Sequence, residues 1–205
     1  MQVFLARHGE TEWNAEHRLQ GRSDTRLTAR GQAHARALAE LLADERIDAI
    51  YTSTLRRTID TAAPLAAARG LRPEARPELA EISYGILEGQ AAHELEDPKL
   101  RDLWEARRRD KLHFRAPGGE SYEELRDRVM PFTEELGRRH ASGSVLIVGH
   151  RATNRVLLGL LLGLSLEETI RLKQKHDCVL EIRPGQEPAR IEHRYAPVAE
   201  PGGNP

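Results

Sequence analysis

The sequence lacks the features of a secreted or membrane-bound protein. Its 205 residues include a single cysteine, Cys178, so no disulfide can form within the chain and a reducing compartment is expected. No apolar run approaches the roughly 20 residues that a membrane-spanning helix needs, and the first run, Val3 to Ala6, is too short for a signal peptide. We therefore predict a cytoplasmic protein that does not bind membranes.

An excess of either charge is missing as well. Lys and Arg number 31 and Asp and Glu number 32, which leaves a formal net charge of −1. Proteins that bind nucleic acids or anionic membranes non-specifically usually carry a basic excess, so we expect neither as a partner. This balance still allows a local positive pocket.

Nucleotide and metal motifs are also absent. Neither GxxxxGK[ST] nor GxGxxG occurs, so the fingerprints of nucleoside-triphosphate and dinucleotide sites are missing. The chain has no CxxC and no histidine pair at i, i+4 spacing, which disfavours a metal site. The nearest candidate, His176-Asp177-Cys178, is explained more simply as a turn before an edge strand. We predict a protein that works without a metal or another cofactor.

Short apolar runs alternate with amphipathic helices in the first third of the chain. Residues 3–6 and 47–51 are predicted strands, and so is the more apolar run 144–148 later in the chain. Thr28 is expected to cap a first helix, and Ser53 or Thr54 a second one. Helical spacing predicts that the buried faces are Ala33, Ala37, Leu38, Leu41 and Leu42 in the first helix and Leu55, Ile59, Ala62 and Ala66 in the second. This alternation is typical of a parallel sheet covered by helices.

The rest of the chain completes an α/β domain. Residues 88–119 are polar and helix-prone, and we expect them to form a short helical excursion over the active site. Capping boxes predict helices after Ser121 and Ser165. Residues 179–193 form a predicted hairpin at the edge of the sheet. Because a second copy could pair with this edge, a homodimer is possible. We predict a single domain, 1–196, that is a three-layer α/β/α sandwich with a mostly parallel sheet of about six strands. The Pro/Gly-rich tail, 197–205, is predicted to be disordered.

Charged residues follow each of the three predicted parallel strands. Arg7 and His8 follow the first, Arg57 lies in the first helical turn after the second, and His150 follows the third. Taken singly, each is more often packed or solvated than functional. Open α/β sheets bind ligands beyond the carboxyl ends of their strands, so we expect these four side chains to converge on one pocket. Two Arg and two His suit a dianion such as phosphate, which Arg can bind with two hydrogen bonds.

Six segments of the chain resemble, in order and spacing, the motifs of the histidine phosphatase superfamily, in its phosphoglycerate-mutase-like group. They are LARHGETEWN, RLQGRSDTRLTARGQAHA, TSTLRRTIDTA, LAEISYGILEG, PGGESYEEL and VLIVGHRATNRVLL. The resemblance implies that His8 is the nucleophile and is phosphorylated during turnover. It also implies that Arg7, Arg57 and a protonated His150 form the rest of the phosphate pocket.

The same resemblance implies roles for further residues around this pocket. Asn14 would add a hydrogen bond to the phosphate, and Glu81 would donate a proton to the leaving group. Gln20 and Gly21 would line the substrate side. Arg151 stands where the family usually has Gly or another small or polar residue. Its amide can still face the phosphate, while its side chain either reaches the substrate or points to solvent.

The family contains phosphatases and cofactor-dependent mutases that share this pocket. The mutases carry a longer insert with a Pro-rich motif, which this chain lacks, and a shorter excursion leaves the pocket more open to water. We therefore predict a metal-independent histidine phosphatase of the acid or alkaline type, a phosphoric monoester hydrolase acting on small phosphorylated metabolites such as acidic or sugar phosphates. A cofactor-dependent phosphoglycerate mutase and a non-catalytic phosphate-binding module are the alternatives.

The charge run Arg107–Lys111 has two interpretations. It is either a solvated helix face interleaved with Glu105 and Asp110, or a positive rim that attracts a second anionic group. In the second case the substrate would be an acidic phosphoester.

Overall fold

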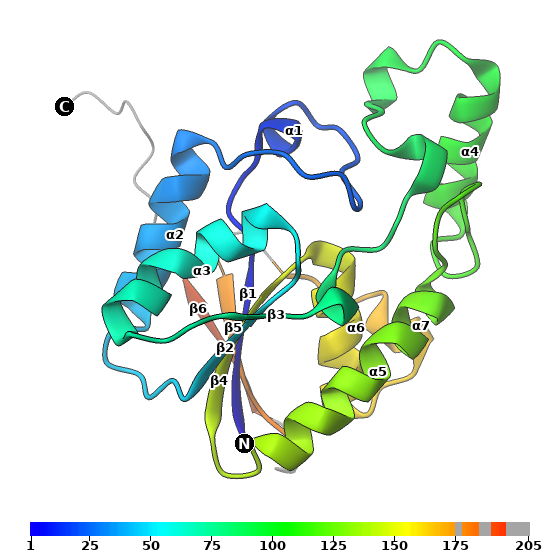
Figure 1. Cartoon of the computed structure of the whole chain (residues 1–205). Helices are drawn as coiled ribbons and strands as arrows, with labels where there is room; N and C mark the ends of the chain where they lie inside the picture. The colour runs from blue at the N-terminus through cyan, green and yellow to red at the C-terminus, as the bar shows by residue number, and fades with distance from the viewer. Residues whose placement is uncertain (175–177, 185–189, 196–205) are drawn as a thin grey trace.

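A six-stranded sheet lies at the centre of the computed structural model, which describes residues 1–174, 178–184 and, by their backbone alone, 190–195 (Figure 1). Its strand order is β3-β2-β4-β1-β5-β6. The bounds are β1 Gln2–Arg7, β2 Ala49–Thr52, β3 Glu74–Ala75, β4 Ser144–Gly149, β5 Cys178–Arg183 and β6 Arg190–Tyr195. The first four strands pair in parallel, and β5 and β6 are antiparallel. The predicted, mostly parallel sheet with an edge hairpin is confirmed.

Helices cover both faces of the sheet, as predicted. On one face lie α2 (Ala29–Leu41) and α3 (Arg56–Arg69), and on the other lie α5 (Tyr122–Arg139), α6 (Arg151–Leu162) and the short α7 (Leu166–Thr169) (Figure 1). Successive residues of β1 face opposite layers, because side chains alternate along a strand. Val3 and Leu5 pack into the core under α5 and α6, whereas Phe4 and Ala6 pack under α2 and α3.

Most of the predicted helix starts are confirmed. The hydroxyl of Thr28 accepts from the Gly31 amide, and Ser121 and Ser165 both form capping boxes. The prediction for α3 is wrong, since its N-cap is Leu55 and no side chain caps it. The Ser53 hydroxyl is 2.8 Å from His150 Nε2 instead, so this residue belongs to the candidate site rather than to the cap.

The predicted buried faces of α2 and α3 are only partly correct. Leu38 and Leu42 are buried, and so are Ala62 and Ala66, but Ile59 is 38% exposed. Ala33, Ala37, Leu41 and Leu55 are only partly buried. The faces turned to the interior include polar residues that apolar spacing does not reveal, namely His34, Arg57, Thr58 and Thr61. Thr61 is buried because its hydroxyl accepts from the Gly9 amide at 2.9 Å, which ties α3 to the loop after β1.

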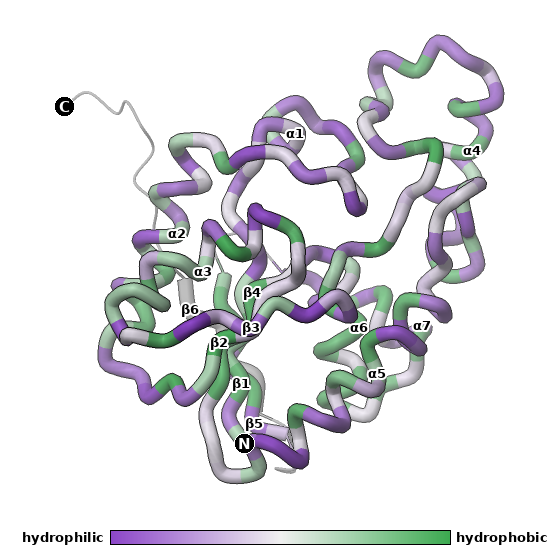
Figure 2. Tube along the Cα trace, viewed as in Figure 1, coloured by the Kyte–Doolittle hydropathy of each residue, from purple (hydrophilic) through white to green (hydrophobic). Residues whose placement is uncertain are grey.

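The excursion extends beyond the sheet as a small lobe around α4 (Pro98–Arg109), with the 3-10 turn η3 (Ala92–Glu94) before it (Figure 1). The tube around α4 is largely hydrophilic, whereas the strands are hydrophobic (Figure 2). The lobe joins the body beside η2 (Gly85–Leu87), where Ile86 N donates to Pro117 O at 3.1 Å. Two smaller elements, α1 (Glu12–Ala15) and η1 (Pro77–Leu79), lie in the loops after β1 and β3.

Two sequence predictions cannot be compared with the described structure, and a third concerns membrane spans. The predicted disordered tail, 197–205, lies outside the described residues, and so do His176 and Asp177 of the weak metal candidate. Across the described residues, no helix is both long and apolar enough to cross a membrane.

Close backbone packing at Gly31 makes α2 sensitive to one methyl group. A Cβ at Gly31 would overlap the carbonyl oxygen of Glu10, whereas a Cβ at Gly137, exposed in α5, would meet nothing. We expect Gly31→Ala to lower the free energy of unfolding by about 1–3 kcal/mol through overpacking. Gly137→Ala should raise it by about 0.5–1 kcal/mol through lower backbone entropy of the unfolded chain. Urea unfolding measures both, and equal effects of the two substitutions would contradict the packing argument.

Candidate active site

The register of two neighbouring strands brings two histidines together. β1 and β4 pair from Gln2 with Ser144 to Arg7 with Gly149, so the residues that follow, His8 and His150, leave the sheet side by side. Their ring centroids are 5.2 Å apart, and the rings are tilted by 59°. Both side chains are buried, at 3% and 0% exposure. The predicted convergence of these two residues is confirmed.

The surroundings of His8 keep its imidazole neutral. Its Nδ1 lies 2.8 Å from Gly9 O, and because a carbonyl oxygen only accepts, Nδ1 carries the hydrogen and Nε2 the lone pair. Burial lowers the pKa of His8 well below 6.5, and the nearby His150, Arg7 and Arg57 lower it further. A neutral imidazole with a fixed tautomer is a competent nucleophile at pH 7.

Arg57 is anchored by the loop between β1 and α2. Its Nη2 donates to Gly21 O and its Nη1 to Ser23 O, both at 2.7 Å. Its Nε donates to His150 Nδ1 at 3.2 Å, and Nη1 also reaches Asp24 at 3.4 Å. Burial lowers the pKa of Arg57, and the charges of Glu81 and Asp24 oppose this effect. These bonds fix the guanidinium beside the two histidines.

His150 is neutral in the unliganded protein. Its Nδ1 accepts from Arg57, so Nε2 carries the hydrogen and donates to Ser53 Oγ at 2.8 Å. Burial, Arg57 and Arg7 lower the pKa of His150 well below 6.5. Two cations therefore surround a fully buried imidazole in the site without phosphate. The protonated His150 that the resemblance implies concerns the phosphate-bound site and stays a prediction.

Arg7, the last residue of β1, carries a charge that the protein does not fully satisfy. Its Nε is buried and has no hydrogen-bond partner among the described residues. Burial lowers the pKa of Arg7 to about 10, the largest opposing effect being the charge of Glu81. Buried donors normally have partners, so an unpartnered guanidinium N–H beside His8 indicates that an anion completes this site.

Glu81 is held at the N-terminus of α6. Its Oε1 accepts from the amides of Ile82 at 3.0 Å, Ala152 at 3.1 Å and Thr153 at 3.2 Å. Its Oε2 accepts only from Ala152, at 3.3 Å, among the described residues. Glu81 is 7% exposed, and its charge acts on both Arg7 and Arg57. The structure therefore brings this carboxyl group to the predicted pocket.

Asn14 and Gln20 brace the loop that follows His8. Asn14 Oδ1 accepts from Thr11 N at 3.2 Å, which completes the capping box of α1. Gln20 is buried and uses both ends of its amide, accepting from Thr11 Oγ1 at 3.2 Å and donating to Thr25 Oγ1 at 2.6 Å. Their contacts with a bound phosphate or substrate stay predictions.

Gly21 and Arg151 border the site in different ways. Gly21 has a φ of 55°, its carbonyl holds Arg57, and a Cβ there would overlap the carboxylate of Glu88. Arg151 is the exposed first residue of α6, and its charge lowers the pKa of Arg7. Its side chain lines a cavity of about 240 Å³ at the edge of the site.

Glu88 is the positioning residue that the sequence analysis missed. Its Oε1 accepts from Arg22 N at 3.1 Å and Tyr84 N at 3.0 Å, and its Oε2 accepts from Ser23 N at 3.0 Å and Ser23 Oγ at 2.8 Å. The carboxylate thus joins the loop that anchors Arg57 to the segment that follows Glu81. Its only sequence signal is its place in LAEISYGILEG, since Arg22 and Ser23, the partners that give it the bridging role, are distant in sequence.

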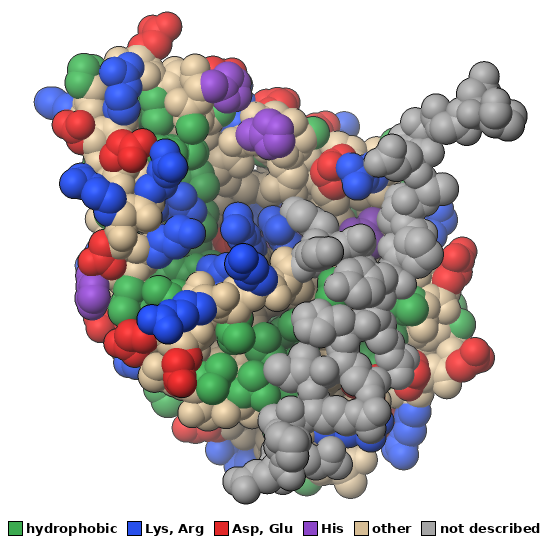
Figure 3. Space-filling model, turned by 180° about the vertical axis from the view of Figure 1, so that it is seen from behind, with side chains coloured by type: hydrophobic (Ala, Val, Ile, Leu, Met, Phe, Trp, Pro, Cys, Tyr) green, Lys and Arg blue, Asp and Glu red, His purple; other side chains and the backbone are tan. Residues whose placement is uncertain are grey.

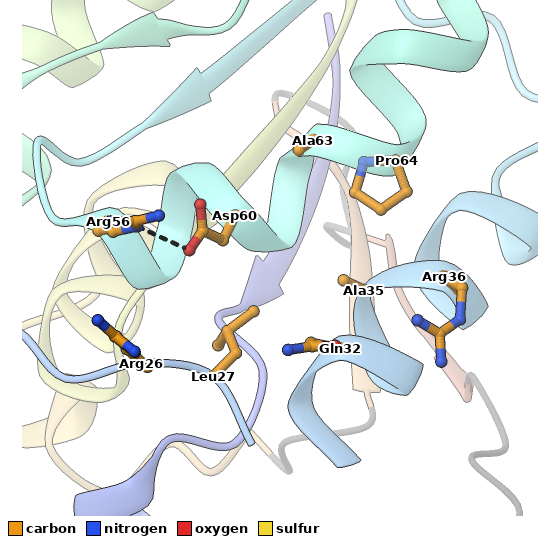
Figure 4. A pocket seen from close by; sticks show the side chains of 9 residues that line it. All are labelled: Arg26, Leu27, Gln32, Ala35, Arg36, Arg56, Asp60, Ala63 and Pro64. Carbon is orange, nitrogen blue, oxygen red and sulfur yellow. Dashed lines mark hydrogen bonds and ion pairs between the residues drawn. The ribbon is translucent and has the colours of Figure 1, made fainter. Parts of the chain in front are cut away.

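A larger cavity, of about 660 Å³, lies between α2 and α3, away from these residues (Figure 4). Its charged groups partly pair with one another, as in the 3.3 Å contact between Arg56 and Asp60. It contains none of the predicted site residues. Within the described ranges, no group of three or more His, Cys, Asp or Glu side chains is arranged to hold a metal ion.

Comparison with known proteins identifies the family. A model of the histidine phosphatase superfamily (branch 1) matches residues 3–196. The chain belongs to this superfamily. The resemblance carried by the six sequence segments is thereby confirmed, and so is the fold class that it implies.

Relatives of this histidine phosphatase chain have several activities. Phosphoserine phosphatase 1 of Hydrogenobacter thermophilus is 35% identical over 82% of this chain and 79% of its own length. The Serratia proteamaculans protein named probable phosphoglycerate mutase GpmB is 35% identical over 96% of this chain and 87% of its own length. The mouse (Mus musculus) 6-phosphofructo-2-kinase/fructose-2,6-bisphosphatase 1 is also 35% identical over 96% of this chain, but the match spans only 40% of that relative's length.

Solved structures agree with the family assignment. The α-ribazole phosphatase from Shigella flexneri superposes with a TM-score of 0.86 at 28% identity, and the match covers 100% of both chains. This similarity extends over the sheet, its helices and the excursion.

The two neutral histidines make the protein sensitive to acid. Their pKa values are lowered in the folded protein, so on unfolding below pH 6.5 each takes up a proton that the folded state excludes. In phosphate-free buffer we expect the free energy of unfolding to fall with pH below 6.5, by up to about 1.4 kcal/mol per pH unit for each histidine. Urea titrations at pH 7.5 and 5.5 measure this change. The His8→Gln/His150→Gln double variant should lose this contribution, and an unaltered pH dependence would disprove the interpretation.

The bridging position of Glu88 predicts a coupled loss of stability and anion binding. In Glu88→Gln an amide NH₂ faces backbone donors, so we expect a loss of about 1–3 kcal/mol in stability and weaker binding of inorganic phosphate. Isothermal titration calorimetry measures the binding. Glu94→Gln, which removes an exposed partner of Arg18, is the control and should change stability by less than about 0.5 kcal/mol. Wild-type phosphate affinity in Glu88→Gln would exclude the positioning role.

Proposed function

We propose that this protein is a phosphatase that hydrolyses small phosphorylated metabolites, acidic or sugar phosphates, through a phosphohistidine at His8. The proposal rests on one observation: the buried, neutral His8 lies beside Arg7, and the Nε of Arg7 has no hydrogen-bond partner in the described part of the chain. The phosphatase names of several relatives, phosphoserine phosphatase 1 among them, support the same reaction class.

The first chemical step forms the phosphohistidine. Nε2 of His8 attacks phosphorus as the ester P–O bond breaks, and protonated Glu81 donates its proton to the leaving oxygen. Oε2 suits this task, because the amides around Glu81 are directed mainly at Oε1. Arg7 and Arg57 neutralise the charge of the transferred group, and each such donor is worth roughly 2.7–4 kcal/mol of barrier.

The second step transfers the phosphoryl group to water. The Glu81 carboxylate accepts a proton from the water that attacks phosphorus, the P–N bond breaks, and His8 and protonated Glu81 are restored. A bound phosphate also favours a proton on His150 Nδ1, because a dianion beside the ring offsets the charges of Arg7 and Arg57. Nδ1 then gives up the hydrogen bond that it accepts from Arg57 Nε and donates to the phosphate instead. These steps use only the chain's own residues, in line with a metal-independent enzyme.

A phosphoglycerate mutase is the second candidate, favoured by the similarity to the Serratia protein. The two activities share the phosphohistidine and differ in what accepts its phosphoryl group. The short excursion supports water as the acceptor, since η3 and α4 form the only helices of the described residues 88–119.

We further propose a cytoplasmic phosphatase of the acid or alkaline type that can form a homodimer. The one cysteine of the sequence, Cys178, is buried and can form no disulfide within the chain, which suits a reducing compartment. The lowered pKa of His8 keeps the nucleophile neutral in mildly acidic solution and so supports activity on the acid side of neutrality. The sheet ends at β6, an edge to which a second copy could add.

Trapping the intermediate tests the mechanism. After a brief incubation with a ³²P-labelled phosphomonoester and a rapid quench, we expect acid-labile, alkali-stable label on His8. His8→Ala should take up no label and lose roughly 1,000-fold or more in kcat. His93→Ala is the matched control, because His93 is an exposed residue of η3 whose ring lies beside Glu94.

Three outcomes decide between the candidate functions. Label on another residue would overturn the mechanism. Wild-type protein that releases no phosphate from any phosphomonoester would favour a binding module without turnover. With 3-phosphoglycerate and 2,3-bisphosphoglycerate present, formation of 2-phosphoglycerate faster than free phosphate would identify a mutase.

A further inference from the structure

The cavity of about 660 Å³ between α2 and α3, called the α2–α3 groove below, has the size of a small-molecule site. Leu27 and Ala35 are buried and form its apolar floor, which Ala63 and Pro64 extend along α3. None of its residues belongs to the cavity beside α4, where other Lys and Arg side chains gather (Figure 3). A ligand in the groove would therefore lie apart from both the phosphate site and the α4 lobe.

Arginines lie at both ends of the groove (Figure 4). Arg26 and Arg56 lie at one end, and Arg36 lies at the other, beyond the apolar floor. Asp60, the one acid of the lining, is 3.3 Å from Arg56. Three arginines and one aspartate leave the lining with a net charge of +2. The chain as a whole has nearly equal numbers of both charges, so this excess is local.

The arginines of the groove can accept an anionic ligand. Arg26 and Arg36 have no carboxylate within ion-pair distance in the described part of the chain. The pair of Arg56 with Asp60 is exposed, and exposed pairs contribute little because water screens both charges. Arg binds carboxylate and phosphate oxygens with two parallel hydrogen bonds. A group with negatively charged oxygens therefore fits either end of the groove.

The length of the groove indicates the shape of the ligand. The residues that line it from α3 share one face of that helix, at spacings of three and four residues, and are Arg56, Asp60, Ala63 and Pro64. A rise of 1.5 Å per residue separates Arg56 from Pro64 by roughly 12 Å along the helix axis. Arg36 of α2 lies on the side of Pro64 (Figure 4). A ligand that reaches both ends is therefore elongated, with an anionic group at each end.

Both helices of the groove also hold the loop that follows His8. In α3, Thr61 accepts from the Gly9 amide at 2.9 Å. In α2, the carbonyl of Gly31 lies so close to Gly9 that a Cβ on Gly9 would overlap it. The Gly9 carbonyl in turn accepts from His8 Nδ1 at 2.8 Å. The packing of α2 against α3 therefore bears on the peptide group that fixes the tautomer of His8.

The loop 21–27 is a second connection between the groove and the phosphate site. Its Arg26 side chain lines the groove, and two of its carbonyl oxygens hold Arg57. Asp24 of the same loop accepts from Arg56 N at 2.6 Å and lies 3.4 Å from Arg57 Nη1. A ligand that contacts Arg26 and Arg56 would therefore act on the segment that anchors Arg57.

We propose that the α2–α3 groove is a regulatory site for an elongated dianion, a small molecule with carboxylate or phosphate groups at both ends of an apolar chain. Arg36 binds one end, and Arg26 and Arg56 bind the other. The ligand clamps α2, α3 and the loop that holds Arg57, and this preorganises the surroundings of His8 for phosphate. It raises the affinity for phosphate, and phosphate raises the affinity for the ligand by the same factor. The regulation rests on the proposed phosphatase function, whereas binding in the groove does not.

Matched ligands test the site by isothermal titration calorimetry. Suberate has a carboxylate at each end of an unbranched chain, and octanoate has the same number of carbon atoms but one carboxylate. We expect suberate to bind roughly 10- to 100-fold more tightly, because octanoate leaves the arginines at one end without a partner. Hexane-1,6-diyldiphosphonate replaces both carboxylates by phosphonates that cannot be hydrolysed. The tighter of the two dianions identifies the preferred anionic group and is used in the further experiments.

Two double variants locate the binding. Arg36→Gln/Arg56→Gln should reduce the affinity for the dianion to about that for octanoate. Arg72→Gln/Arg138→Gln removes two exposed charges outside the groove and should keep the wild-type affinity. Thermal unfolding checks that each variant is folded. Arg36→Gln alone, at an exposed position of α2, replaces a double variant that is not folded.

Inorganic phosphate is the probe for the regulation. With the ionic strength held constant by sodium chloride, a saturating dianion should lower the Kd of the wild-type protein for phosphate by about 5-fold or more. Saturating phosphate should lower the Kd for the dianion by the same factor. In the folded Arg36→Gln/Arg56→Gln variant the ratio of the phosphate Kd values without and with the dianion should be close to 1.

The outcomes separate the groove from the proposed function. Absence of binding of both dianions, equal affinities for suberate, the diphosphonate and octanoate, or dianion binding unchanged in the folded Arg36→Gln/Arg56→Gln variant would overturn the site. A dianion that weakens phosphate binding would contradict the clamping and overturn the proposal. Binding that needs the groove arginines but leaves the phosphate Kd unchanged would overturn the regulation alone. These measurements need no turnover, so absence of hydrolysis of every phosphomonoester would overturn only the proposed function.

Discussion

The parallel pairing of β1 with β4 is the constraint on which the candidate site depends. It sets Arg7 opposite Gly149, so the next residue of each strand, His8 and His150, enters the same buried space. A shift of the register by one residue would turn every side chain of β1 to the opposite face of the sheet. The apolar residues of these two strands thus stabilise the fold and position the two imidazoles at once.

The buried positive charge of Arg7 and Arg57 is the second constraint. The surrounding loops position the guanidinium of Arg57. Arg57 is anchored by two carbonyl oxygens of the 21–24 loop, and Glu88 ties that loop to the segment after Glu81. The same cations keep both histidines neutral while no anion is bound. Such a site is destabilised when empty and stabilised by a dianion, which couples ligand binding to the protonation of His150.

The excursion brings groups to the site that the sheet does not provide. The side chains that converge beside His8 come from the strand ends and the loops after them. The lobe around α4 adds Arg107 and Lys111 to a cavity of about 240 Å³, which Arg151 of α6 also lines.

Local patterns in the sequence determined the strands other than the two-residue β3, the capped helices at Thr28, Ser121 and Ser165, and the family. Apolar runs, capping boxes and ordered motifs are properties of neighbouring residues. The buried faces of α2 and α3 were only partly predictable, since polar contacts such as that between Thr61 and Gly9 decided which side is covered. Only the tertiary structure decided the neutral state of His150, the bridging carboxylate of Glu88 and the place of Arg107 and Lys111 at a cavity shared with α6. Each of these depends on groups far apart in the chain, whose electrostatic fields and hydrogen bonds exist only once the strands and loops have come together.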